Sequence, residues 1–211
     1  MGLAVGVGVL ADTLENDSDG AQWFRESFES INEVLAENGL PPHQEPETLP
    51  PLDSRDTIGS FPYSWLHHLR RAAAYAAETP GWIATPFPES SDPATDPVVE
   101  RRTFQLDSHL LCHSDCEGFY VPIRFEEVLF DDDRISGGML GSSFVLLDEL
   151  IAVAPALGIR LGGSELSDDE VERINGEVDD ESPLWIEQAV WLSLFEAARL
   201  SVRHGTAICF G

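Results

Sequence analysis

Residues 182–211 read SPLWIEQAVWLSLFEAARLSVRHGTAICFG, and they predict both the longest helix and one strand of the fold. Apolar residues recur at helical spacing from Ile186 to Ala198, with Ser182 as the expected cap and Pro183 at the first helical position. A narrow polar stripe runs along the same helix: Gln188, Glu196, Arg199 and Arg203. The last six residues, TAICFG, predict a strand that can pair with the N-terminal one.

The rest of the chain alternates between helical and extended patterns. Residues 2–11, GLAVGVGVLA, are small and β-branched and predict a buried strand, followed by an acidic turn. Residues 99–130 predict two further strands that are joined by HSDCE. Four more helices are predicted at residues 19–38, 62–78, 142–159 and 166–176.

Proline-rich segments at about residues 40–60 and 83–98 predict irregular loops, because proline fixes φ and lacks a backbone donor. No internal repeat and no domain boundary is visible, and 211 residues suit a single core. We therefore expect one α+β domain over residues 1–211. In it, a small, mostly antiparallel sheet is covered by about five helices.

The charge is the strongest signal in the composition. The chain holds 38 acidic residues against 12 basic ones, all arginine, for a formal net charge of −26. Such a charge opposes binding to nucleic-acid phosphates and to anionic membranes. It favours encounter with a basic protein, and we expect a partner such as a toxin domain, with no nucleic acid and no membrane. Adaptation to salt is the alternative reading of the same charge.

Three cysteines, Cys112, Cys116 and Cys209, cannot all pair with one another inside the chain. No basic start followed by an apolar stretch and a cleavage site is visible at the N-terminus. We therefore expect reduced thiols and a bacterial-type cytoplasmic location.

Residues 113–122, HSDCEGFYVP, are the densest chemical stretch. His113, Asp115, Cys116, Glu117 and Tyr120 lie within eight residues and follow Cys112 directly. A structural zinc site usually draws on two ligand clusters, and the second is missing here. A polar turn before a strand is the favoured reading, and a metal-binding or cysteine-dependent enzyme centred on Cys112–Glu117 is the alternative. We expect no cofactor, no metal and no catalytic residue.

Basic side chains gather on the helix predicted at residues 62–78, where His67, Arg70 and Arg71 lie together. These side chains can bind a carboxylate of a ligand, or they can neutralise neighbouring acids of the chain itself. The second role is favoured, because intramolecular pairing is almost forced at this charge balance.

The segment ELSDDEVERINGEVDDE, residues 165–181, is the acidic stretch expected to contact a basic partner. The residues assigned to this contact are Glu165, Asp168, Asp169, Glu172, Asp179 and Asp180. Their carboxylates would imitate a polyanion, and the attraction would weaken in high salt.

Three segments carry a resemblance: HSDCEGFYVP, WFRESFESINEVLAENGLPPHQEPE and FPYSWLHHLRRAAAYA. Together they resemble uncharacterised bacterial proteins that are similar to the immunity proteins of polymorphic toxins. The resemblance brings no assigned catalytic residues. It implies a non-enzymatic acidic module that binds another protein and neutralises it.

Overall fold

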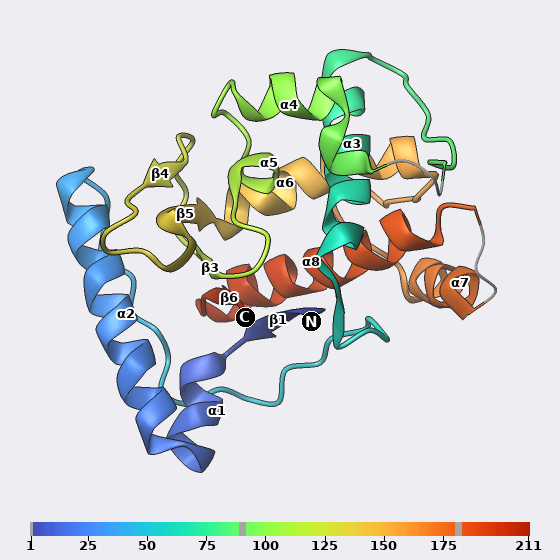
Figure 1. The fold of residues 1–211 in the computed structure, drawn as a ribbon. Coiled ribbons are helices and arrows are strands. Elements are labelled where there is room, and N and C mark those ends of the chain that lie inside the picture. Colours follow the sequence, from blue (N-terminus) through green and yellow to red (C-terminus); the bar gives the residue numbers. More distant parts are fainter. Residues whose placement is uncertain (1, 89–91, 180–182) are drawn as a thin grey trace.

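The computed structural model describes residues 2–88, 92–179 and 183–211. Its strands form one mixed sheet in the order β2-β1-β6-β3-β5-β4 (Figure 1). All neighbouring strands are antiparallel except β3 and β5, which are parallel. The strands are β1 (Gly2–Val7), β2 (Ser60–Pro62), β3 (Gly118–Val121), β4 (Leu129–Phe130), β5 (Met139–Ser142) and β6 (Ile208–Phe210).

Helices cover both faces of this sheet, and the alternation of side chains along the strands divides the core into two. Phe119 and Val121 of β3 face one cluster, while Tyr120 between them faces the other. Helices α1 and α2 pack on the first face, and α3, α6 and α8 pack on the second (Figure 1). The helices are α1 (Val9–Asn16), α2 (Ser18–Glu37), α3 (Tyr63–Glu78), α4 (Pro97–Thr103), α5 (His109–Cys112), α6 (Ser143–Val153), α7 (Asp168–Asp179) and α8 (Trp185–His204).

Helix α8 is the centre of the larger cluster, because every residue from Glu187 to Ala198 is buried. Two of its buried side chains donate to carbonyls of neighbouring elements: the indole of Trp191 to Leu150 at 2.8 Å and the amide of Gln188 to Leu157 at 3.0 Å. Gly205 ends the helix in the left-handed region, φ 68°, which glycine adopts without strain. The chain then enters β6, which pairs with β1 from Val5↔Phe210 to Val7↔Ile208. The predicted pairing of the two ends of the chain is confirmed.

The proline-rich segment between α2 and β2, residues 38–59, is held by buried polar contacts. Asn32 of α2 exchanges two hydrogen bonds with the backbone of His43. The buried carboxylate of Glu45 accepts from the imidazole of His43, the hydroxyl of Thr206 and the backbone N–H of Ala207. This connector therefore joins α2 to the two residues that precede β6, which explains how so long a loop is ordered.

The α+β class and the mostly antiparallel sheet are confirmed, while two local predictions are wrong. Residues 99–112 are not a strand, because Asp96 caps α4 through Val98 N–H and Ser108 caps α5 through Leu111 N–H. The acidic segment after β1 is helix α1 rather than a turn. These three short helices raise the count from about five to eight in the part of the chain that the structure describes.

The predicted start of the longest helix differs slightly. Pro183 lies in a turn, and α8 begins at Trp185, while Ser182, the expected cap, lies outside the described residues. Within the described ranges, no helix has both the length and the apolar character that crossing a bilayer requires.

Candidate functional site

The loop that connects α5 to β3, residues 113–117, is fixed by one buried arginine of α3. The guanidinium of Arg70 donates to the carbonyls of Leu110 (2.9 Å) and His113 (2.5 Å) and to the carboxylate of Asp115. Nε2 of His67 lies 3.2 Å from the same carboxylate. Burial would raise the pKa of Asp115, but hydrogen bonds from His67 and Arg70 outweigh it and hold that pKa at about 2.

Two aromatic residues of the same loop and strand are buried against each other. The rings of His113 and Tyr120 stack with centroids 4.1 Å apart, and the Tyr120 hydroxyl donates to the carbonyl of His109. Gly141 makes room for this stack, since a Cβ there would lie 2.2 Å from the Tyr120 ring. Burial lowers the pKa of His113 to about 4, so the imidazole is neutral at pH 7.

The thiols near this loop are free and do not form a reactive group with His113. Both ring nitrogens of His113 face backbone carbonyls, those of Ser114 (3.1 Å) and Phe119 (3.2 Å). Cys112 is buried, which raises the pKa of its thiol, and Cys116 is exposed. Among the described residues, no three His, Cys, Asp or Glu side chains are placed to hold a metal ion. The loop is therefore built as a structural turn.

The remaining members of the predicted cluster are also held by neighbours. Arg71 donates to Asp96 at 2.9 Å and lies over the rings of Tyr75 and Phe87. The carboxylate of Glu117 accepts from the hydroxyl of Ser136 at 2.6 Å. The structure brings His67, Arg70, His113, Asp115 and Tyr120 together, and it places Arg71 away from them, against the segment that follows α3.

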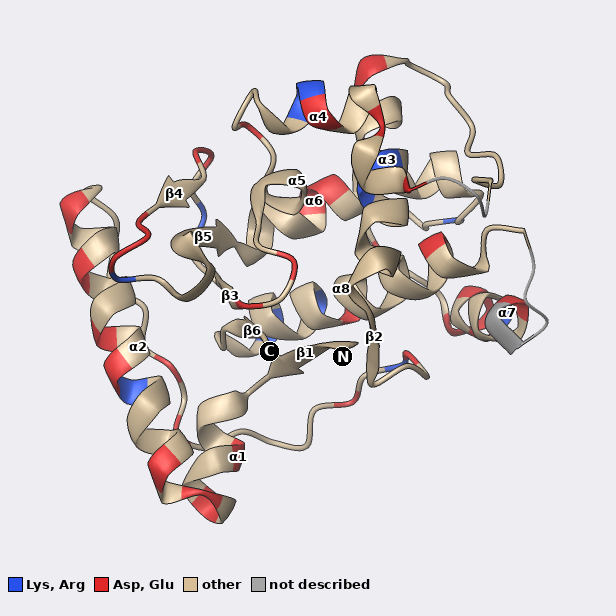
Figure 2. Ribbon diagram, viewed as in Figure 1, with Lys and Arg blue, Asp and Glu red and all other residues tan. Residues whose placement is uncertain are grey.

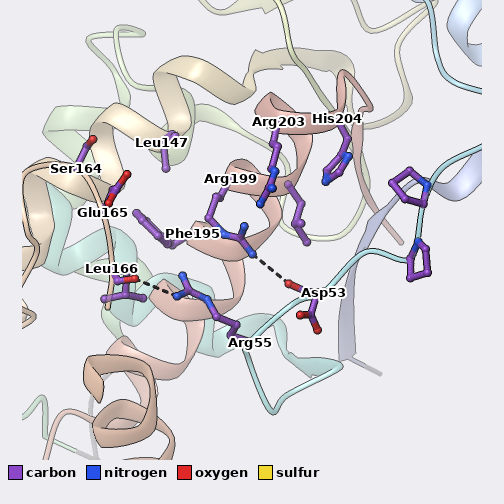
Figure 3. A pocket seen from close by; sticks show the side chains of 13 residues that line it. Asp53, Arg55, Leu147, Ser164, Glu165, Leu166, Phe195, Arg199, Arg203 and His204 are labelled. Carbon is purple, nitrogen blue, oxygen red and sulfur yellow. Dashed lines mark hydrogen bonds between the residues drawn. The ribbon is translucent and has the colours of Figure 1, made fainter. Parts of the chain in front are cut away.

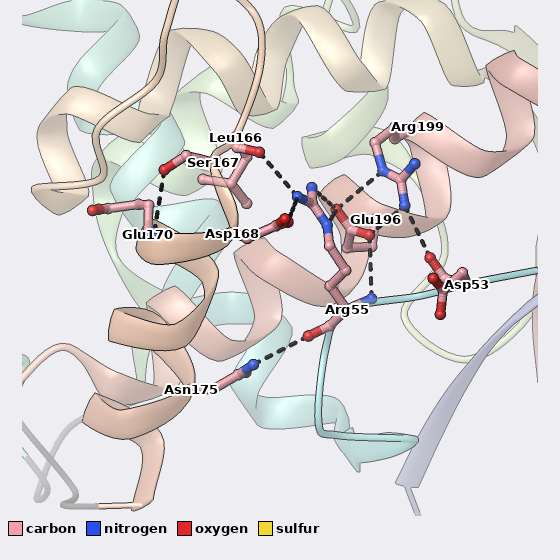
Figure 4. A network of polar contacts seen from close by, with 9 residues as sticks. All are labelled: Asp53, Arg55, Leu166, Ser167, Asp168, Glu170, Asn175, Glu196 and Arg199. Carbon is pink, nitrogen blue, oxygen red and sulfur yellow. Dashed lines mark hydrogen bonds and ion pairs between the residues drawn. The ribbon is translucent and has the colours of Figure 1, made fainter.

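The predicted acidic segment forms a turn and helix α7, and arginines bind two of its carboxylates, those of Asp168 (Figure 4) and Glu170. Arg55 binds Asp168 at 2.9 Å and the buried Glu196 at 2.6 Å. Arg160 and Arg173 both bind Glu170. Burial would raise the pKa of Glu170, but these arginines hold it at about 2.

Four assigned residues of this segment are exposed, and we call them the α7 patch: Glu165, Asp168, Asp169 and Glu172. Asp179 ends α7, with a side chain outside the described part of the structure, and Asp180 is likewise not described.

Helix α2 carries a second acidic surface, which lies outside the predicted partner contact (Figure 2). Its buried side holds Phe28, Ile31, Val34 and Leu35. The opposite side presents five exposed carboxylates, which we call the α2 stripe: Asp19, Glu26, Glu29, Glu33 and Glu37. The sequence signal was available, because Glu26, Glu29, Glu33 and Glu37 follow one another three or four residues apart and so share one face of a helix.

The α2 stripe is extended at both ends by other exposed acids. Asp12, Glu15 and Asp17 precede it on α1 and at the N-cap of α2, and Asp132 and Asp133 lie in the turn beyond Glu37. Arg134 ties this turn to the stripe, since its guanidinium binds both Glu37 and Asp131 at 2.6 Å. The hydrogen bond from Arg134 keeps the pKa of Glu37 below its ordinary value, so this carboxylate is ionised at pH 7.

One comparison with known proteins gives a match. The model of a family described as "Putative DNA-mimic protein" matches residues 1–210. No curated protein and no solved structure matches the chain.

The match overturns the expected partner. We expected a basic toxin and excluded nucleic acid, and that prediction is wrong because the family is described by its imitation of DNA. The physical premise was sound but incomplete. A net charge of −26 opposes contact with phosphates, yet a dense array of negative charge is also what a protein needs in order to resemble DNA.

Proposed function

This chain belongs to the DNA-mimic family, and we propose that it binds a DNA-binding protein by presenting carboxylates where that protein would contact backbone phosphates. Phosphate contacts supply most of the sequence-independent affinity of DNA-binding proteins, through Lys and Arg side chains. A protein that offers anions to the same side chains competes with DNA for one surface. The family match carries this proposal, and the acidic surfaces provide its chemistry.

The α2 stripe is the surface that we assign to this role. From Asp19 to Glu37 it extends about 27 Å at 1.5 Å per residue, which corresponds to about eight base-pair steps of 3.4 Å. From Glu26 to Glu37 its carboxylates follow one another at about 4.5–6 Å along the helix axis. They project from a helix that is packed on the sheet through Phe28 and Leu35, so the backbone that carries them is ordered before binding.

The α7 patch is less suited to the same role, because three arginines lie among its acids. Arg55 binds Asp168 of the patch, and Arg160 and Arg173 bind the neighbouring Glu170. Arg25 is the only basic residue of α1 and α2, against seven acids, and it binds Glu47 in the connector. Arg134 reaches only one end of the α2 stripe, where it binds Glu37 and lies 3.9 Å from Glu33. The α2 and α7 surfaces lie at opposite sides of the molecule (Figure 2), so one partner of ordinary size would contact one of them.

Trp23 adds a contact of a different kind beside the α2 stripe. The residue is 47% exposed although its ring packs on Phe24 and lies near Phe119. Exposed tryptophans are frequent among the residues that dominate binding energy in protein interfaces. We include Trp23 in the partner-binding surface. The resemblance to immunity proteins stays a prediction, and this proposal does not depend on it.

The test is competition with DNA. DNA-binding proteins from the source organism are loaded on immobilised duplex DNA and eluted with the purified protein. An eluted protein supports the proposal only if, once purified, it binds either the chain or duplex DNA but not both together. A ternary complex would contradict DNA mimicry.

Two charge variants locate the surface. The triple variant Glu26→Gln, Glu29→Gln, Glu33→Gln should weaken binding by at least about tenfold, since each lost charged contact contributes on the order of 1 kcal/mol. The matched variant Glu165→Gln, Asp169→Asn, Glu172→Gln removes three exposed carboxylates from the α7 patch and should change binding by less than about twofold. The reverse result would assign the function to α7.

A further inference from the structure

A cavity of about 810 Å³ opens between the C-terminal half of α8, the connector and the turn before α7 (Figure 3). Its volume lies within the range of about 300–1,000 Å³ that is typical of small-molecule sites. The cavity is separate from the α2 stripe, and none of its residues belongs to that surface.

Cationic groups gather in this cavity, although the chain as a whole is strongly acidic. Arg55, Arg199 and Arg203 line it, three of only 12 basic residues, together with His204. Arg199 and Arg203 are four residues apart on α8 and therefore lie one turn apart on the same face. Figure 3 shows both side chains directed into the same space, with His204 beside them.

Two of these guanidiniums are held in place by a buried acid. The carboxylate of Glu196, which is fully buried, accepts from Arg55 at 2.6 and 3.1 Å and from Arg199 at 2.6 and 3.1 Å (Figure 4). Arg199 also donates to the carbonyl of Asp53 at 3.1 Å. Little side-chain entropy remains to be lost when such fixed groups bind a ligand.

Arg203 supplies the charge that is not compensated. Glu196 and Asp168 offset Arg55 and Arg199, whereas Arg203 is exposed and has no hydrogen bond or ion pair within the described residues. A small anion placed between Arg199 and Arg203 would receive charge-assisted hydrogen bonds from at least one free guanidinium.

The other walls of the cavity restrict what kind of anion fits. Leu147, Phe195 and Leu200 line it with apolar surface, and Pro50 and Pro51 add more from the connector. Glu165 and the carboxylate of Asp53 also border the space (Figure 3), and they would repel a highly charged ligand. We propose that this cavity binds a small organic anion of low charge, a carboxylate or a phosphate monoester, with an apolar body against Leu147 and Phe195.

Isothermal titration of the full chain tests this with four probes: octanoate, phenyl phosphate, inorganic phosphate and neutral octanol. Saturable binding of octanoate or phenyl phosphate is expected, and the stronger of the two distinguishes a carboxylate site from a phosphate site. Arg203→Gln should weaken that binding by at least about tenfold. The matched variant Arg124→Gln, another exposed arginine outside the cavity, should leave it within about twofold.

Several results would overturn the proposal. These are the absence of saturable binding by either organic anion, equal affinity for octanol, equal affinity for inorganic phosphate, or unchanged affinity in Arg203→Gln. Thermal unfolding of that variant should match the parent, because Arg203 makes no hydrogen bond or ion pair with the residues that the structure describes. The α2 stripe is intact in this variant, so its competition with DNA separates a failure here from a failure of DNA mimicry.

Discussion

Arg70 illustrates how one residue can organise a loop that resembles an active site. Replacing it with methionine keeps the aliphatic stem but leaves the carbonyls of Leu110 and His113 without their donor and Asp115 without its main cation. We expect Arg70→Met to lower the free energy of unfolding by about 3 kcal/mol. Urea denaturation measures this, and Arg124→Met, which breaks an exposed pair with Asp148, should cost less than about 1 kcal/mol. Equal losses in both variants would contradict the structural role.

Glu149 makes the folding stability of the protein depend on pH near neutrality. Its carboxylate accepts from the backbone N–H groups of His109 and Leu110 at 2.9 and 2.7 Å, and burial raises its pKa to about 7. Between pH 4.5 and 7 the folded state therefore holds a proton that the unfolded state has lost, so this group makes stability fall as pH rises. Relative to Glu149→Gln, the parent should lose up to about 3 kcal/mol across this range.

Urea denaturation of both proteins at pH 4.5, 6 and 8 checks this. The buried histidines, His109 and His113, have lowered pKa values and act in the opposite direction below pH 6.5, but both proteins contain them. Only the difference between the two curves reports Glu149. Parallel curves would show that the carboxylate is solvated in the folded state.

At the residue scale, local signals in HSDCEGFYVP predict a turn before a strand, and β3 begins at Gly118. The charge balance of the chain predicts that Arg70 pairs with an acid of the same chain, and Arg70 binds Asp115. The sequence does not indicate which acid this is, because Asp115 lies 45 residues away. The cluster around Glu196 could not be predicted, because Arg55 lies 141 residues away and only the course of the connector brings it there.

At the scale of the element, the α2 stripe has an energetic cost that can be measured. Like charges three or four residues apart on a helix repel, and Glu29 lies in this relation to both Glu26 and Glu33. Glu29→Lys would convert both contacts into attractions. We expect it to raise the free energy of unfolding by about 0.5–1 kcal/mol while it weakens binding of the DNA-binding partner.

A gain in stability together with a loss of partner binding distinguishes a stripe that binds the partner from one that only contacts solvent. Thermal denaturation measures the stability of Glu29→Lys, and competition with duplex DNA measures its partner binding. The control is Glu172→Lys in the α7 patch, which should not weaken partner binding. A gain in stability with unchanged binding would remove α2 from the interface.

Elements with strong periodicity were predicted from the sequence, and short capped ones were not. Helices α2, α3 and α6 each bury an apolar side that recurs every three to four residues, and α8 has a long, mostly apolar run that is buried all round. Helices α4 and α5 span seven and four residues, too few to show a period, and only Asp96-Pro97 and Ser108 mark their starts. The α2 stripe could not be singled out for a different reason. In a chain with 38 acids, acids spaced three or four residues apart are expected by chance, and only the structure shows that these lie on an exposed side of a helix.

For the whole molecule, the net charge of −26 acts in opposite directions on folding and on binding. In the folded state the acids are closer together than in the unfolded chain, and their mutual repulsion destabilises the folded state. Salt screens that repulsion, since the Debye length falls from about 30 Å at 0.01 M to about 3 Å at 1 M. The same screening weakens attraction to a basic DNA-binding surface.

We therefore expect the melting temperature of the free protein to rise with salt while its affinity for the DNA-binding partner falls. The salt dependence of this affinity should also be shallower than that of the same partner for duplex DNA. DNA has one charge per about 1.7 Å and releases condensed counterions on binding, whereas the α2 stripe has one carboxylate per roughly 5 Å. Differential scanning calorimetry and affinity measurements from 0.05 to 0.5 M NaCl test both statements. Binding to the chain that is insensitive to salt would mean that apolar contacts such as Trp23, rather than carboxylates, dominate the interface.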